Sequence, residues 1–107
     1  MGIQSKYTTV KEIMNLKGFY LTHTGGNCTA YEHILENGDS ILIADDNSAP
    51  ENISDICVVG LYDNEGNELS FWEDMEGIES ALHAAKFYVS EYYADKEQDE
   101  HHILSRG

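Results

Sequence analysis

The sequence predicts an α+β domain in which two helices accompany an antiparallel sheet of four or five strands. Three observations support this class. A capping motif opens a short helical stripe near the N-terminus, β-branched and aromatic runs separated by glycine turns follow, and a long amphipathic segment comes last. Short turns require antiparallel pairing, because parallel strands need long crossovers. We therefore expect two layers, with the long C-terminal helix covering one face of the sheet.

The first helix is predicted over residues 10–17. Thr8 and Thr9 precede its apolar positions, and Glu12 stands three residues after Thr9, which is the spacing of a capping box. Gly18 follows the stripe, and glycine is the residue type that most often ends a helix.

Two hairpins are predicted next. Residues 19–24 and 28–35 flank Gly25-Gly26-Asn27, so they are expected to pair around a glycine turn. Asn37-Gly38 is the strongest local signal in the chain, because both residues tolerate the positive φ angles of a type I′ turn. A third strand is expected to follow over residues 40–44.

The middle of the chain predicts a loop and two further strands. Residues 45–55 are too polar to lie inside and contain the only proline, Pro50, so they indicate a surface loop. The apolar run 56–62 has the length of a strand, and the turn at 63–68 leads into a short fifth strand at 69–72.

The last predicted element is a long amphipathic helix that begins after Asp74. Its apolar residues recur at intervals of three and four, and its charged residues occupy the other side. The periodicity ends at Lys96, so we expect a single domain over residues 1–96 and a mobile acidic tail over residues 97–107.

The charge balance excludes several classes of function. Six Lys and Arg stand against 20 Asp and Glu, which gives a formal net charge of −14. Direct binding to nucleic acid or to an anionic membrane surface needs basic clusters that the chain lacks. The chain also has no apolar run of signal-peptide or membrane-spanning length. Its two distant cysteines, Cys28 and Cys57, are typical of a reducing cytoplasm.

The residues suited to catalysis or metal binding form only weak patterns. If Gly25-Gly26 makes the turn, His23 faces Cys28 across the hairpin, which is the contact that a thiol nucleophile and its base would need. A slip of one residue would separate them, and no positive group nearby would lower the thiol pKa. The histidines lack ligand spacing for zinc. We therefore expect no catalytic residue, metal or cofactor, and a small thiol enzyme or hydrolase is the less favoured alternative.

The excess of carboxylates predicts a binding function. B-DNA carries one charge per about 1.7 Å of axis, and a compact acidic domain can present a comparable density to a protein that grips phosphates. Self-repulsion is a cost that a purely structural role would not require, although acidity also aids solubility. Aromatic residues near the end of the long helix predict either a contact patch for another chain or a second copy, or a broad core face. The predicted partner-binding residues are Asp45, Asp46, Glu51, Asp63, Glu65, Glu68, Glu73, Asp74, Glu76, Glu79, Tyr88 and Tyr92.

Parts of the chain resemble small acidic proteins encoded by phages and mobile elements. The resemblance covers about residues 22–90 and is carried by Thr24-Gly25-Gly26-Asn27-Cys28-Thr29-Ala30, Asn37-Gly38, Ile41-Leu42-Ile43-Ala44-Asp45 and Val59-Gly60-Leu61-Tyr62-Asp63. It implies a bacterial host cell as the setting and no catalytic residues. By analogy of charge with DNA-mimicking anti-restriction proteins, it implies an anti-defence role.

Together these observations predict a non-enzymatic, cytoplasmic module that binds a basic, nucleic-acid-handling protein, and the finer prediction is that it acts as a DNA mimic. The alternative is a structural or regulatory module that associates with itself as a homodimer. The sequence leaves open the partner, the strand order and whether Ile34 or Leu35 faces the interior.

Overall fold

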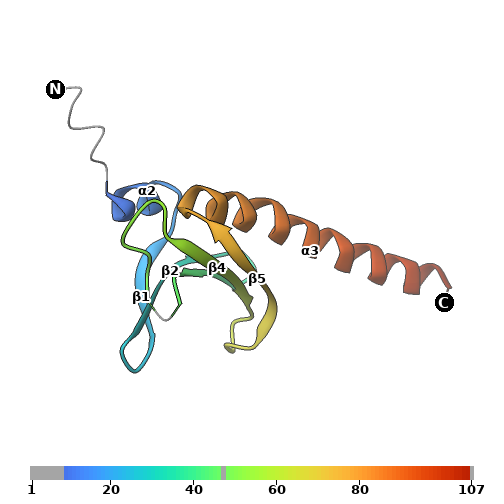
Figure 1. The fold of residues 1–107 in the computed structure, drawn as a ribbon. Coiled ribbons are helices and arrows are strands. Elements are labelled where there is room, and N and C mark those ends of the chain that lie inside the picture. The colour runs from blue at the N-terminus through green and yellow to red at the C-terminus, as the bar shows by residue number, and fades with distance from the viewer. Residues whose placement is uncertain (1–8, 47, 107) are drawn as a thin grey trace.

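The computed structural model confirms the predicted α+β class (Figure 1). It describes the backbone of residues 9–46 and 48–106, and the side chains of residues 9–46 and 48–96. The elements in chain order are α2 (Val10–Leu16), β1 (Tyr20–Gly25), β2 (Cys28–Ile34), β3 (Ser40–Ala44), β4 (Ile56–Tyr62), β5 (Glu68–Glu76) and α3 (Ile78–Arg106).

The five strands form one antiparallel meander, in which each strand pairs with its neighbour in the chain, in the order β1-β2-β3-β4-β5. Both helices lie on the same face of this sheet (Figure 1). The core fills the space between the two layers. It contains Val10, Met14, Phe19, Tyr31, Ile41, Ile43, Cys57, Val59, Leu61, Ile78, Ala81, Ala84, Ala85 and Val89.

Helix α2 begins and ends as the sequence predicts. The backbone N–H of Glu12 donates to Thr9 Oγ1 at 3.2 Å, and the N–H of Thr9 donates to Glu12 Oε1 at 3.2 Å, which completes the capping box. At the other end Gly18 has a φ of 85°, and the N–H of Phe19 donates to the carbonyl of Met14 at 2.9 Å. This bond is typical of a Schellman cap, which turns the chain into β1.

Both predicted hairpins form, but their turns differ in detail. Gly25 pairs with Cys28, so Gly26 and Asn27 make the first turn. This turn lies within the expected Gly25-Gly26-Asn27 and one residue later than the Gly25-Gly26 turn that would oppose His23 to Cys28. Among the described residues only Asp46 and Asp74 combine a side chain with a positive φ, so Asn37 does not adopt the predicted type I′ conformation. In that second turn only Gly38 has a positive φ, of 94°.

Strand β5 is longer and α3 starts later than the sequence predicts. The expectation of a helix beginning directly after Asp74 is wrong, because Met75 pairs with Cys57 as part of β5. The strand ends at Glu76, and the next residue, Gly77, has a φ of 90° and an N–H that donates to the carbonyl of Asp55 at 3.1 Å. The helix therefore begins at Ile78, where contacts with the β3–β4 loop set the boundary.

Two expectations about burial are refined. Leu35 packs against the core, whereas Ile34 is exposed, which settles their competition for the interior. The β3–β4 loop is on the surface as predicted, but Ala49 and Pro50 within it are buried. The N–H of Ala49 donates to Thr29 Oγ1 at 2.9 Å and ties the loop to β2.

Helix α3 continues past the sheet to Arg106 (Figure 1). The predicted mobile tail falls on residues 97–107, whose side chains lie outside the described part of the chain, so it stays a prediction. No helix in the described part is both long and apolar enough to cross a membrane.

In the part of the chain that the structure describes, no helix covers the sheet face away from α2 and α3, which we call the uncovered sheet face and which is largely apolar. One row across it joins Tyr20, Glu32, Leu42, Gly60 and Phe71 through successive strand pairs. The ring of Tyr62 lies over Gly60, because a Cβ at position 60 would come within 2.6 Å of Tyr62 Cε1. The missing side chain at this position makes room for the tyrosine ring.

We expect Gly60→Ala to lower the free energy of unfolding by roughly 1–3 kcal/mol, because the new Cβ must displace the Tyr62 ring. In a Tyr62→Ala background the same change should be neutral or stabilising by up to about 1 kcal/mol, since alanine restricts the unfolded chain more than glycine does. Urea unfolding of the four proteins measures both effects. An equal loss in the two backgrounds would contradict this packing.

Candidate functional site

Two acidic turns lie side by side at one end of the sheet. The β2–β3 and β4–β5 turns share this end because the intervening strands alternate in direction. They approach closely, since a Cβ on Gly38 would lie 3.6 Å from Asn64 Cβ. We call the carboxylates on these turns the hairpin-end cluster, which comprises Glu36, Asp39, Asp63, Glu65 and Glu68.

Asp63 organises the β4–β5 turn of this cluster. Its Oδ1 accepts from the N–H of Asn67 at 2.8 Å and from that of Glu65 at 2.9 Å, and its Oδ2 accepts from Asn67 Nδ2 at 3.0 Å. These bonds, first of all the one from the Asn67 backbone, hold the pKa of Asp63 below its usual value. The carboxylate is therefore ionised and fixed in position.

Asp39 links the other turn to α3. The hydroxyl of Tyr93 donates to Asp39 Oδ2 at 2.5 Å, and Asn37 Nδ2 donates to the same oxygen at 3.2 Å. Burial is the main reason that the pKa of Tyr93 is raised, so its hydroxyl stays protonated as the donor. Exposed Glu91 and Asp95 flank Tyr93 along α3 and bring further negative charge to that part of the helix.

A second group of carboxylates occupies the opposite end of the sheet, where β3 and β5 finish. Asp55 caps the loop there, and its Oδ2 accepts from the N–H groups of Asn52 at 2.9 Å and Glu51 at 3.0 Å. These two bonds lower the pKa of Asp55. The other members of this group are Asp45, Asp46, Glu51, Asp74, Glu76 and Glu79.

The partner-binding residues that the sequence predicts are thus divided between two ends of the molecule. Asp63, Glu65 and Glu68 belong to the hairpin-end cluster, and Glu73 is exposed along β5. The others except the two tyrosines lie at the opposite end. The prediction omitted Glu36 and Asp39, although alternating strand direction along the chain places their turn beside that of Asp63.

The two predicted tyrosines have different surroundings. Tyr88 is 39% exposed and packs against Trp72 of β5, with ring centroids 5.9 Å apart. Tyr92 packs against the edge of the core and meets Tyr93 edge to face at 5.3 Å. Tyr88 is therefore the more accessible of the two for contact with another chain.

The geometry does not favour Cys28 and His23 as a thiol nucleophile and its base. His23 pairs with Thr29 and Cys28 with Gly25, so the register that would oppose His23 to Cys28 does not occur. Cys57 is buried, and its Sγ donates to the Asp55 carbonyl at 3.3 Å. Burial, reinforced by the charges of Asp45 and Asp55, raises the pKa of Cys57 to about 11.

Among the described residues, no group of three or more His, Cys, Asp or Glu side chains is placed to hold a metal ion. Comparison of the chain with family models, curated proteins and solved structures finds no match. The functional argument therefore rests on the geometry of the hairpin-end cluster and of the surfaces around it.

Replacing Asp63 by Ala should lower stability at neutral pH, because it removes the acceptor that holds the β4–β5 turn. A depressed pKa contributes stability above the unfolded-state pKa and loses it as the pH falls through the folded-state pKa. The difference between the wild type and Asp63→Ala should therefore shrink between about pH 5 and pH 2. Urea unfolding across this range checks the trend. Glu65→Ala is the control, and a gap that stays constant with pH would contradict the assignment.

Cys57 should resist alkylation in the native protein at about pH 8, since a thiol with a pKa of about 11 is almost entirely protonated there. Iodoacetamide labelling followed by peptide mass spectrometry measures this directly. The same reaction in urea should modify Cys57 readily, which provides the reference. Rapid native labelling of Cys57 would contradict its burial and would return a thiol enzyme to consideration.

Proposed function

We propose that this protein is a non-enzymatic binding module that docks its hairpin-end cluster onto a basic site of another protein. The observation that carries the proposal is the contact between two turns bearing five carboxylates, within a chain of formal net charge −14. A surface of this kind attracts clusters of Lys and Arg and repels nucleic acid and anionic membranes.

The fixed positions of two of these carboxylates support a recognition role. Asp63 and Asp39 are held by hydrogen bonds from the turn residues and from α3, so little conformational entropy is lost when a partner binds them. Glu36, Glu65 and Glu68 are exposed on the same two turns, where they are free to pair with cations. The cluster thus combines fixed and adaptable negative charges.

The finer proposal is that the partner handles nucleic acid and that the cluster competes with DNA for its basic site. The resemblance of about residues 22–90 to small acidic phage and mobile-element proteins supports a host defence protein as the target, in the cytoplasm of a bacterial cell. The buried thiol of Cys57 and the separation of His23 from Cys28 support a non-enzymatic role.

Self-association is a second candidate, favoured by the uncovered sheet face. Tyr20, Ile34 and Phe71 are 59%, 66% and 41% exposed on that face. Repulsion between two copies of charge −14 opposes such a dimer, so added salt should strengthen it. Binding to a basic partner should weaken with salt, and this opposite dependence separates the two candidates.

The test uses the immobilised protein and a bacterial cytosolic extract. Proteins captured at about 50 mM salt should elute by about 200 mM, and a short DNA duplex should displace them. The variant Glu36→Gln/Glu65→Gln/Glu68→Gln should lose the captured proteins. The control Glu51→Gln/Glu76→Gln/Glu79→Gln changes the net charge equally at the opposite end and should retain them.

Capture that is insensitive to salt, or that the two triple variants lose equally, would overturn the proposed docking surface. Salt-sensitive capture that DNA does not displace would contradict the finer proposal of DNA mimicry alone. Multi-angle light scattering at both salt concentrations measures self-association in the same samples.

A further inference from the structure

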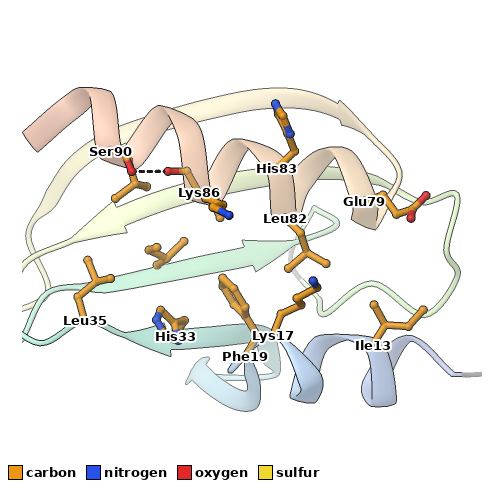
Figure 2. Close-up of a pocket in the computed structure, with 13 residues that line it drawn as sticks. Ile13, Lys17, Phe19, His33, Leu35, Glu79, Leu82, His83, Lys86 and Ser90 are labelled. Carbon is orange, nitrogen blue, oxygen red and sulfur yellow. Dashed lines mark hydrogen bonds between the residues drawn. The ribbon is translucent and has the colours of Figure 1, made fainter. Parts of the chain in front are cut away.

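A cavity of about 580 Å³ lies between the two helices and the sheet (Figure 2). Its volume falls within the range of small-molecule sites. The apolar part of its lining comes from every element around it and includes Ile13, Phe19, Leu35, Ile41, Leu82 and Val89. The cavity therefore offers an apolar floor that is open to solvent between α2 and α3.

Four side chains with basic nitrogens belong to this lining: Lys17, His33, His83 and Lys86. Lys17 caps the end of α2 and Lys86 stands on α3, and both are exposed, so their amino groups are available at the mouth. Figure 2 shows Lys17 reaching across the gap toward Leu82 of α3. His33, another of these side chains, belongs to β2.

The orientation of His33 is fixed by its neighbours. Its Nδ1 lies 2.9 Å from the carbonyl oxygen of Gly18, which makes Nδ1 the donor and leaves Nε2 for another partner. Its ring also packs against Phe19 with centroids 5.3 Å apart. A Cβ on Gly18 would lie 3.0 Å from Nδ1, so the glycine that ends α2 also makes room for this imidazole.

Lysine side chains are concentrated at this cavity, although the chain as a whole has a formal net charge of −14. Four lysine side chains are described, and two of them line this one cavity, whereas the cavity lining includes a single carboxylate, that of Glu79. In Figure 2 Glu79 points away from the cavity. His83 also points away, and its ring stacks on Phe87 at 4.3 Å.

We propose that this cavity binds a small amphipathic carboxylate, with its apolar tail on the sheet and its head between Lys17 and Lys86. Burial of the tail supplies most of the binding free energy, and hydrogen bonds from the ammonium groups fix the head. An uncharged analogue leaves the lysines without an anion, and a cationic one is repelled. The site is separate from the hairpin-end cluster, so its test is independent of the test of the proposed function.

The test titrates the full chain with octanoate by isothermal titration calorimetry. Saturable binding of one octanoate is expected, together with a higher thermal midpoint, because the ligand bridges α2 and α3 only in the folded state. Octanamide, which has the same tail without the charge, should bind about tenfold more weakly or worse. Equal binding of the two, or no saturable binding of octanoate, would overturn the proposal.

Matched variants locate the head group. Lys17→Gln/Lys86→Gln should weaken octanoate binding about tenfold or more, since it removes both charged donors and keeps the side-chain stems. Lys11→Gln/Lys96→Gln changes the net charge equally but lies outside the cavity lining, so it should bind as the wild type does. Equal loss in both variants would show that only the net charge matters and would refute the site.

A second measurement needs no variant. In NMR spectra of the unaltered protein, octanoate should shift the methyl resonances of Ile13, Leu82 and Val89, which line the cavity. The methyls of Ile34 and Leu42, on the uncovered sheet face, should stay unshifted. Shifts confined to the uncovered face would place the ligand there and refute the cavity as its site.

Discussion

The packing of α3 against the sheet is the contact on which the rest of the structure depends. Ala81, Ala84 and Ala85 form a small-residue surface on the helix, and with Ile78 and Val89 they are buried against the sheet. Among the described residues this contact leaves the opposite sheet face without a helix, and it brings Tyr93 to the β2–β3 turn. It also sets the gap to α2 in which the cavity lies.

The acidity of the chain has two physical roles. Asp55 and Asp63 accept backbone hydrogen bonds at the turns they organise, so these carboxylates contribute to the fold itself. Glu36, Glu65 and Glu68 are exposed on turns already shaped by other residues and are available to a partner. In the proposed docking surface, the exposed side chains add adaptable charges to the fixed charges of Asp63 and Asp39.

Negative and positive charge are segregated by the architecture. A meander puts its turns at the two ends of the sheet, and the turns of this protein are rich in Asp and Glu, so carboxylates gather at both ends. Lys17 instead caps the end of α2 and Lys86 lies on α3, and these two helices lie together on one sheet face. The molecule thus presents anionic ends and a mixed apolar and cationic cavity, and these suit ligands of opposite charge.

The sequence by itself determined the features that depend on neighbouring residues: the Thr9 capping box, the glycine end of α2, the two predicted hairpins and the excess of carboxylates. Tertiary structure decided those that depend on distant residues. The start of α3 follows from the bond between Gly77 and Asp55, the hairpin-end cluster from two turns brought together by strand direction, and the cavity from two helices far apart in the chain. Periodicity and turn chemistry report only local backbone preference, so they could not reveal which remote side chains would meet.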